Sequence, residues 1–299
     1  MITEHDFEQD GSSRQFFQKS PTQLPCLCRF ADPKGTVQRH VPWHWHSEIE
    51  INYVTEGTWL FSTIDHEYEL TSGDIIFVNA GSLHTTRWKD GTIPGKFISI
   101  IFDADFLCGI YGNLLDQKYI HPIVSCAALQ SYVIHPLGES GLAMAQNIIN
   151  VWRLFRDEPY GYEFAARSEL TVFWCRLLEE TEAVRSNPNT VNLAANVIKP
   201  MIEYIHTHYM EKLTLTKIAE MGSVSTRECN RIFHKYIHAT PIDYVNAYRL
   251  RMAAHALLKR EKSIAQIAEE SGFSSTSYMA KMFRATYHCT PGEFRADND

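Results

Sequence analysis

The chain has 299 residues, 44% of them hydrophobic, which is enough for two or more domains with buried cores. No apolar run approaches the ~18 residues of a membrane span, and the polar N-terminus MITEHDFEQDGSSRQ lacks the apolar centre of a signal peptide. The seven cysteines are scattered, which favours a reduced cytoplasm over a disulfide framework. The formal net charge of −7 is uneven, with −10 over residues 1–194 and +3 over residues 195–299. We therefore expect a cytoplasmic chain with two tasks, an acidic front part and a mildly basic back part.

Short strand-like segments follow one another between residues 24 and 135. EIEINYVTEG, TWLFSTID, GDIIFVNAG and GKFISIIFD are each bounded by turn residues, and their spacing is typical of an antiparallel sandwich or barrel. From residue 139 the apolar residues recur at helical spacing, and Pro159 and Gly161 separate two such stretches. This pattern predicts a helical hairpin. Residues 185–192, RSNPNTVN, have the composition of a linker, and everything beyond them is predicted to be helical.

The stretch PWHWHSEIEINY carries a run of polar residues at every second position. In a strand, alternate side chains share a face, so His44, His46, Glu48, Glu50 and Asn52 are expected on one side. On periodicity alone this is also the pattern of an ordinary strand with its polar side in water.

The wider region matches the two motifs of the cupin barrel, H-x-H-x3-E-x6-G followed by G-x5-P-x-G-x2-H. The matching positions are His44, His46, Glu50, Gly57, Gly73, Gly81 and His84. The motif proline alone is replaced, by Asn79. Residues 24–135 thus resemble a cupin domain, and the resemblance implies that the polar face lines the inside of a jelly-roll barrel. The apolar face would then be covered by the helical hairpin or by a second subunit.

The resemblance implies a ligand pocket in this barrel. The residues expected to bind an effector are His44, His46, Glu48, Glu50, His84 and Trp88. The set that the resemblance implies for one divalent metal is His44, His46, Glu50 and His84. Three imidazoles and a carboxylate suit Zn, Fe, Mn, Ni or Cu without choosing among them. The alternative is a cavity of hydrogen-bonding groups that binds a polar organic ligand directly and requires no cofactor.

Residues 213–244 and 264–294 form an internal repeat. Phe233, Pro241 and Tyr244 are matched 50 residues later by Phe283, Pro291 and Phe294. Each repeat contains an Ile-Ala pair, a short turn with glycine, then a serine and a new helix. This is the layout of a helix-turn-helix, in which the second helix enters the major groove of DNA.

Two such units joined by the helix YRLRMAAHALL resemble the AraC family of bacterial transcription regulators. The residues of the family's sequence signature correspond here to Arg249-Leu250, Ala253, Ala268, Gly272-Phe273, Tyr278, Phe283 and Thr290-Pro291. An N-terminal cupin-like sensor is also usual for this family. The sequence departs from the pattern at His238 and His288, where glycine is common; histidine tolerates a positive φ better than a branched residue does.

The exposed positions of the two second helices are the predicted DNA contacts. In the first unit Arg227 and Asn230 are expected to read bases, since arginine pairs with guanine and asparagine with adenine. Arg231 and His234 are expected to contact phosphates, and Thr226 is a further predicted DNA contact at the start of the same helix. The weaker readers of the second unit are Ser275, Thr276, Ser277 and Lys281.

The expected architecture is a multidomain α and β protein. It has a cupin-like effector domain (1–135), a helical hairpin and linker for dimerisation (136–194), and an all-α AraC-type DNA-binding domain with two helix-turn-helix units (195–299). The expected function is a transcription regulator that binds double-stranded DNA and responds to a small molecule, with a sugar as the effector that the family suggests. A homodimer and contact with RNA polymerase are expected. The alternatives are a metal-dependent cupin enzyme and a regulator for which the metal is the signal.

Overall fold

The computed structural model describes residues 8–9, 15–16, 24–31, 40–89, 95–109, 112–186, 193–237 and 239–297. The chain divides into two compact units, one built mainly from residues 14–192 and the other mainly from residues 193–299. Each unit has a core of its own, and each is described separately.

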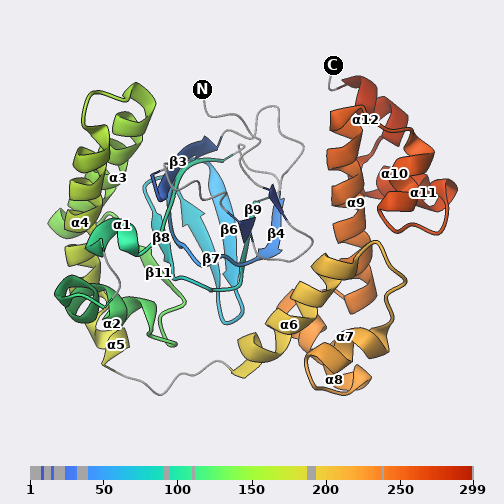
Figure 1. Cartoon of the computed structure of the whole chain (residues 1–299), viewed down its shortest axis with the longest axis horizontal. Coiled ribbons are helices and arrows are strands. Elements are labelled where there is room, and N and C mark those ends of the chain that lie inside the picture. The colour runs from blue at the N-terminus through green and yellow to red at the C-terminus, as the bar shows by residue number, and fades with distance from the viewer. Residues whose placement is uncertain are drawn as a thin grey trace. The chain divides into compact units, whose positions relative to one another are not determined.

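Two antiparallel sheets form the centre of the first unit (Figure 1). The larger has the order β11 (Ser131–Ile134), β8 (Ile75–Val78), β5 (Ile49–Glu56), β10 (Lys96–Phe102) and β3 (Cys26–Ala31). The smaller has the order β4 (His40–His44), β9 (His84–Trp88), β6 (Thr58–Thr63) and β7 (Glu67–Thr71). Two short strands, β1 (Glu8–Gln9) and β2 (Gln15–Phe16), pair with each other. The order of the strands in the two large sheets agrees with the predicted jelly-roll fold.

The two faces of the larger sheet have different partners. Ile49, Ile51 and Phe77 belong to the main apolar cluster of the unit, together with side chains of the helical hairpin. Val54, on the opposite face of β5, packs instead with Trp59 and Phe61 of the smaller sheet. The space between the sheets is therefore lined by the second set of alternating residues, to which Glu50 and Asn52 belong.

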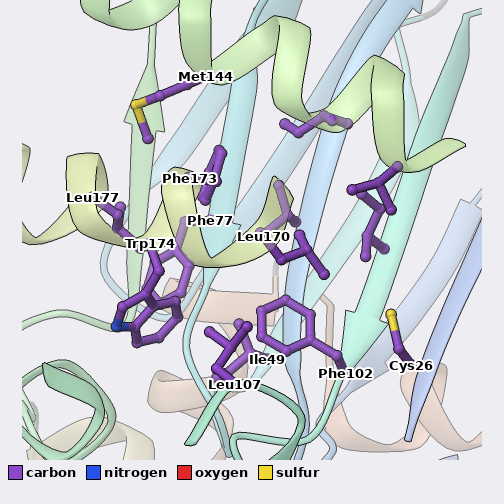
Figure 2. Packing of buried hydrophobic residues seen from close by; sticks show 14 of the residues in the cluster. Cys26, Ile49, Phe77, Phe102, Leu107, Met144, Leu170, Phe173, Trp174 and Leu177 are labelled. Carbon is purple, nitrogen blue, oxygen red and sulfur yellow. The ribbon is translucent and has the colours of Figure 1, made fainter. Parts of the chain in front are cut away.

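The hairpin consists of α3 (Gly138–Asp157) and α4 (Tyr162–Glu180), as the periodicity predicted. Its turn passes through Glu158 and Gly161, both with positive φ, and these residues end one helix and begin the next. Leu170, Phe173 and Trp174 of α4 face the larger sheet (Figure 2). Phe173 and Trp174 are at most 2% exposed, and the Trp174 indole donates a hydrogen bond to the Tyr119 carbonyl at 2.9 Å. The hairpin therefore covers the apolar face of the sheet within the same chain.

Short helices complete the first unit. They are α1 (Asp105–Cys108), the π-helical turn η1 (Asp116–Ile120), α2 (His121–Val124) and α5 (Glu182–Arg185). Asn79, which replaces the motif proline, ties this region to the loop before β9. Its amide nitrogen donates to the carbonyls of Ile123 and Leu129, both at 2.9 Å. A proline at this position could not make these bonds, so the departure from the motif has a structural explanation.

From residue 193 onward, all the regular secondary structure in the described part of the second unit is helical. Its helices are α6 (Leu193–His208), α7 (Leu215–Met221), α8 (Thr226–Ile232), the π-helical turn η2 (Phe233–Ile237), α9 (Pro241–Lys259), α10 (Ile264–Glu270), α11 (Thr276–Tyr287) and α12 (Pro291–Asp297). The predicted internal repeat is confirmed, with α7 and α8 corresponding to α10 and α11. Ile218 and Ile267 are fully buried at equivalent places, and so are Phe233 and Phe283.

Serine caps begin the second helix of each repeat. Ser225 accepts a hydrogen bond from the amide of Glu228 at 3.2 Å, and Ser275 accepts one from Tyr278 at 3.1 Å. At the end of α11, His288 has φ 60°, the left-handed conformation that glycine usually supplies. The positive φ that the departure from glycine left open is thus present at His288, whereas His238 lies outside the described residues. None of the described helices combines the length and apolar character needed to cross a membrane.

Candidate functional site

A polar cluster of His44, His46, Glu50 and His84 lies between the two sheets of the first unit. Their possible ligand atoms all lie within 4.8 Å of one another, and the four residues are at most 8% exposed. Glu50 comes from the larger sheet, whereas His44 and His84 are paired neighbours on β4 and β9 of the smaller one. The structure therefore brings together the four residues that the sequence motifs predicted as a group.

The strand that the sequence predicted here is not continuous. PWHWHSEIEINY includes the end of β4 and the start of β5, which belong to different sheets, and His46 and Glu48 lie in the connection between them. The expectation of a single strand face was wrong at this point. The polar residues still converge because the chain crosses from one sheet to the other while both sheets face the same interior.

Each histidine of the cluster has one ring nitrogen fixed by the backbone. Nδ1 lies 2.8 Å from the Pro42 carbonyl in His44, 3.0 Å from the Glu48 carbonyl in His46, and 2.8 Å from the Ser82 carbonyl in His84. A carbonyl only accepts, so Nδ1 carries a proton in all three rings. In the neutral ring this leaves the lone pair on Nε2, which is the arrangement that metal-binding histidines generally have.

The carboxylate of Glu50 joins these rings. Its Oε2 lies 3.2 Å from Nε2 of His46 and 3.0 Å from Nε2 of His84. Its Oε1 accepts hydrogen bonds from Asn52 Nδ2 and Ser99 Oγ, each at 3.1 Å. Two hydrogen bonds thus hold one oxygen, and this leaves the other directed at the histidines.

Burial and charge shift the pKa values of the cluster in opposite directions. Burial lowers the pKa of His44 well below its usual value, and repulsion from the other two histidines adds to this effect. Burial alone would raise the pKa of Glu50, but hydrogen bonds and attraction from His46 and His84 lower it well below its usual value. For His46, burial lowers the pKa, and the hydrogen bond and charge of Glu50 more than reverse this, so the net pKa is raised. Glu50 is therefore an anion next to at least one neutral imidazole at neutral pH.

This set of residues fits a divalent transition metal. Metal–nitrogen and metal–oxygen bonds of about 2.0–2.2 Å place ligand atoms about 3.3–3.6 Å apart around a tetrahedral ion, and roughly 4.4 Å apart when they lie on opposite sides of it. The four ligand atoms lie within 4.8 Å of one another, so they would move closer together on binding an ion. Three Nε2 lone pairs and one carboxylate oxygen supply four ligands, and the carboxylate offsets part of the charge. Glu50 Oε2 lies close to Nε2 of both His46 and His84, and oxygen and nitrogen lone pairs at this distance repel each other unless a proton lies between them. A bound metal ion would remove this repulsion by accepting both kinds of lone pair.

The other two predicted effector residues lie differently. Glu48 is buried, but its Oε1 accepts a hydrogen bond from Ser47 Oγ and it is not part of the four-residue group. Trp88 packs with an apolar cluster that also contains Trp59 and Phe61. Phe61 connects the two regions, since its ring stacks on His84 with centroids 5.5 Å apart. The space between the sheets thus has a polar part and an apolar part.

Sequence reasoning missed the role of two residues that hold Glu50 of the polar cluster, Asn52 and Ser99. Asn52 was placed on the correct face without a role, and Ser99 was not considered. The signal for Ser99 was its position as the one polar residue in the strand segment FISIIF. Both are at least 93% buried, and Asn52 Oδ1 has no hydrogen-bond partner among the described residues.

The predicted DNA contacts lie on the second helices of the two repeats. In α8, Thr226 and Arg227 are exposed, and the Arg227 side chain makes no hydrogen bond or ion pair with the described residues. Asn230 Nδ2 donates to the Thr226 carbonyl at 3.1 Å, which leaves its Oδ1 and one amide hydrogen for other partners. Arg231 instead forms an ion pair with Glu228 on the same helix, at 2.6 Å. His234 is exposed one turn later.

The corresponding residues of the second unit lie at the start of α11. Ser275 is the helix cap, Thr276 is half-buried, and Ser277 and Lys281 are exposed. Equivalent positions therefore carry Arg227 and Asn230 in one unit but Ser277 and Ala280 in the other. The side chains able to form two hydrogen bonds with a base are concentrated in the first unit.

Comparisons with known proteins agree with both parts of this description. A family model described as an AraC-like ligand binding domain matches residues 33–133, and a helix-turn-helix domain model matches residues 218–297. The uncharacterized HTH-type transcriptional regulator YdeC of Bacillus subtilis is 25% identical over 293 residues, covering 98% of this chain and 99% of YdeC. The HTH-type transcriptional activator RhaS of Enterobacter is 24% identical over 268 residues, covering 88% and 90%. A crystal structure of ToxT from Vibrio cholerae with an unsaturated fatty acid bound has a TM-score of 0.47 at 13% identity, covering 90% and 94%.

Both matched domains, in the order found here, are those of a DNA-binding regulator with a ligand-binding domain. The chain belongs to the AraC family of transcription regulators. It is accordingly a regulator that binds DNA, and not a cupin enzyme with an accessory DNA-binding part.

Proposed function

We propose that this regulator responds to a divalent transition metal ion bound between the sheets of its first unit. The observation that carries the proposal is that possible ligand atoms of His44, His46, His84 and Glu50 all lie within 4.8 Å of one another. Nδ1 of each histidine is fixed by a backbone carbonyl, which leaves Nε2 available to a metal. Bound there, the metal would act as an electrostatic cross-link between residues of different strands. It would supply no redox or hydrolytic chemistry that the regulatory function needs.

The positions of the ligands suggest how a signal could arise. Glu50 belongs to the larger sheet, and His44 and His84 belong to the smaller one. A bound ion would hold the two sheets at one separation and neutralise the buried carboxylate. The response requires that the DNA-binding and non-binding states differ in metal affinity, because an equal affinity would shift no equilibrium.

A polar organic effector, such as a sugar, is the second candidate. One observation favours it: Asn52 Oδ1 is a buried acceptor without a partner among the described residues, and a hydroxyl group could donate to it. The apolar part of the same space, with Trp59 and Trp88, would contact a sugar ring. The close spacing of the four ligand atoms favours the metal, because a sugar needs more room than the metal does.

The proposed assembly follows the family's organisation. Residues 1–135 would bind the effector, residues 136–194 would support a homodimer, and residues 195–299 would bind operator DNA. The protein would act in the cytoplasm and contact RNA polymerase at the promoters that it regulates.

Metal analysis together with DNA binding tests the proposal. The full-length protein is purified without chelators, and its metal content is measured by mass spectrometry. Operator affinity is then measured with and without each divalent metal. We expect close to one equivalent of metal and a metal-dependent operator affinity, with metal affinity changed by the same factor when DNA is present.

Variants give the matched comparison. His84→Ala should lose the metal and its effect on DNA binding, whereas His121→Ala, an exposed histidine of the same unit, should retain both. A metal content below a tenth of an equivalent after reconstitution would contradict the metal proposal. If the wild-type protein contains no metal and a sugar raises its thermal unfolding temperature, the second candidate would be favoured.

A further inference from the structure

Glu228 and Arg231, on the second helix of the first repeat, form a two-point ion pair. Arg231 Nε donates to Glu228 Oε2 at 2.8 Å, and Arg231 Nη2 donates to Oε1 at 2.6 Å. The side chains are 39% and 61% exposed, respectively, so the pair lies on the open side of α8. Such parallel hydrogen bonds fix the plane of the guanidinium as well as its position.

The pair leaves one edge of the Arg231 guanidinium available. A guanidinium has five N–H groups in a planar fork, and Glu228 takes one from Nε and one from Nη2. The two Nη1 hydrogens and the second Nη2 hydrogen remain. The end of the fork can therefore still donate two parallel hydrogen bonds, which is what O6 and N7 of guanine accept in the major groove.

Charge distinguishes a base contact from a phosphate contact here. Attraction to DNA depends mainly on the positive charges brought near phosphates, and a carboxylate bound to the same arginine offsets its charge. An arginine that served only to contact phosphate would be more effective without Glu228. The pair thus decreases general attraction to DNA while it increases the order of the arginine.

The second repeat provides an internal comparison. Tyr278 and Lys281 stand 50 residues after Glu228 and Arg231, and both helices begin at an equivalent serine cap. The Tyr278 ring contacts Phe273, at a centroid distance of 6.2 Å, and Lys281 has no acidic residue one turn before it. A lysine without a paired acid suits phosphate as a point charge. The same helix position is therefore built differently in the two repeats.

We infer that Glu228 is a positioning residue for sequence recognition: it holds Arg231 so that the free edge of the guanidinium reads one guanine of the operator. The inference rests on the DNA-binding function of the family. It changes the role expected for Arg231 from the sequence, since phosphate contact is replaced by base reading. Glu228 itself has no contact with DNA in this arrangement.

Selection of DNA sequences by the full-length protein tests the inference. Operators are enriched from a random duplex pool, and affinities for the selected site, for each single-base change and for random duplex are measured at several salt concentrations. For Glu228→Gln we expect the preference for guanine at one position to fall by about tenfold, the range of one bidentate contact. Affinity for random duplex should rise, with a salt dependence steeper by about one unit, because one negative charge is removed.

Two further variants make the test specific. Arg231→Lys keeps the charge but not the planar fork, so it should lose the same guanine preference while keeping the salt dependence of the wild type. Glu220→Gln is the matched control, because Glu220 forms the same kind of pair with Lys217, three residues before it, at 3.1 Å on α7. It should leave every base preference unchanged.

Two results would overturn the inference. One is an unchanged base preference in both Glu228→Gln and Arg231→Lys. The other is an Arg231→Ala variant that loses affinity equally for all sequences, with a salt dependence reduced by about one unit, which is the result for a phosphate contact. A wild-type protein that enriches no sequence would contradict sequence-specific DNA binding itself, and this failure is recognised before any variant is made.

Discussion

The carboxylate of Glu50, on β5 of the larger sheet, lies 3.0 Å from Nε2 of His84, on β9 of the smaller sheet. The two residues are 34 positions apart in the chain and are both buried. This contact connects the sheets of the ligand-binding unit through ionisable groups, where apolar packing would otherwise be expected. It is the reason that a charged ligand could change how the two sheets are held together.

Removal of the buried anion should abolish metal binding. In Glu50→Gln the amide keeps nearly the same shape but carries no negative charge, so one metal ligand and its charge are lost. We expect metal affinity to fall by a hundredfold or more, measured by competition with a coloured chelator. Glu67→Gln, an exposed glutamate on β7, is the control and should bind metal as the wild type does. Equal affinities of the two variants would show that Glu50 is not a ligand.

Ser99 should contribute to metal affinity without contacting the metal. Its hydroxyl donates to Glu50 Oε1 at 3.1 Å and thereby orients the other oxygen toward the histidines. Loss of such an outer hydrogen bond typically weakens metal binding by about 10–100-fold. Isothermal titration of Ser99→Ala should show this loss, while Ser62→Ala, whose hydroxyl bonds the exposed Glu67, should be unchanged. An affinity of Ser99→Ala within twofold of the wild type would contradict this role.

Trp174 should be a major source of stability in the first unit. It is 2% exposed, packs edge-on against Phe77 and Phe102, and donates a hydrogen bond to Tyr119. Trp174→Ala should reduce the free energy of unfolding by about 3–5 kcal/mol, measured by urea denaturation of the full chain. Phe164→Ala is the control on the same helix, since Phe164 is 80% exposed, and it should change stability by less than about 0.5 kcal/mol. A small effect of Trp174→Ala would mean that the hairpin does not pack on the sheet as described.

Arg227 should contribute to base recognition by the first repeat. It is exposed at the start of α8 and makes no side-chain bond to the described residues, so its guanidinium is available to DNA. Arg227→Ala should weaken operator binding by about 1–3 kcal/mol and relax base preference at one position. Lys259→Ala, at the end of α9, should cause no change in base preference. An Arg227→Ala footprint and affinity identical to those of the wild type would remove this residue from the DNA interface.

His288 should be replaceable by glycine with no loss of stability. Its φ of 60° is accessible to glycine without the steric cost that a side chain brings. We expect His288→Gly to be neutral or to stabilise the second unit by up to about 1 kcal/mol in thermal unfolding. His288→Val should destabilise it, since a β-branched residue is poorly tolerated at positive φ. The opposite order of the two variants would show that His288 acts through its imidazole rather than through its backbone.

Much of the fold could be predicted because it depends on local patterns. The alternation of polar and apolar residues that ends at Glu56 corresponds to β5, and the apolar residues at helical spacing that include Trp174 correspond to α4. The two serine caps, Ser225 and Ser275, begin the helices that the repeat predicted. The residues of these patterns are near one another in sequence, so secondary structure and its buried face follow from spacing alone.

The partners of particular side chains could not be predicted in the same way. The bonds of Ser99 to Glu50 and of Asn79 to Leu129 span 49 and 50 residues, and no sequence period relates such positions. The change of sheet between His44 and Glu50 was missed for a related reason. Polar residues continue to occupy every second position through the connection, although the connection is not a strand. Glu228 was overlooked because a glutamate in the first turn of a helix ordinarily stabilises the helix dipole, and only the position of Arg231 gives it another partner.

By itself, the sequence determined that this chain has an antiparallel β unit with a histidine-rich motif and a duplicated helix-turn-helix unit, because these features are encoded in the spacing of residues. The jelly-roll fold of the β unit was implied by its resemblance to the cupin motifs. Only the tertiary structure decided which nitrogen of each histidine is held by the backbone, which oxygen of Glu50 is directed at the histidines, and which edge of Arg231 remains available. These properties depend on distances of about 3 Å between atoms that folding brings together from separate strands or turns, and hydrogen bonding has an effect only at such distances.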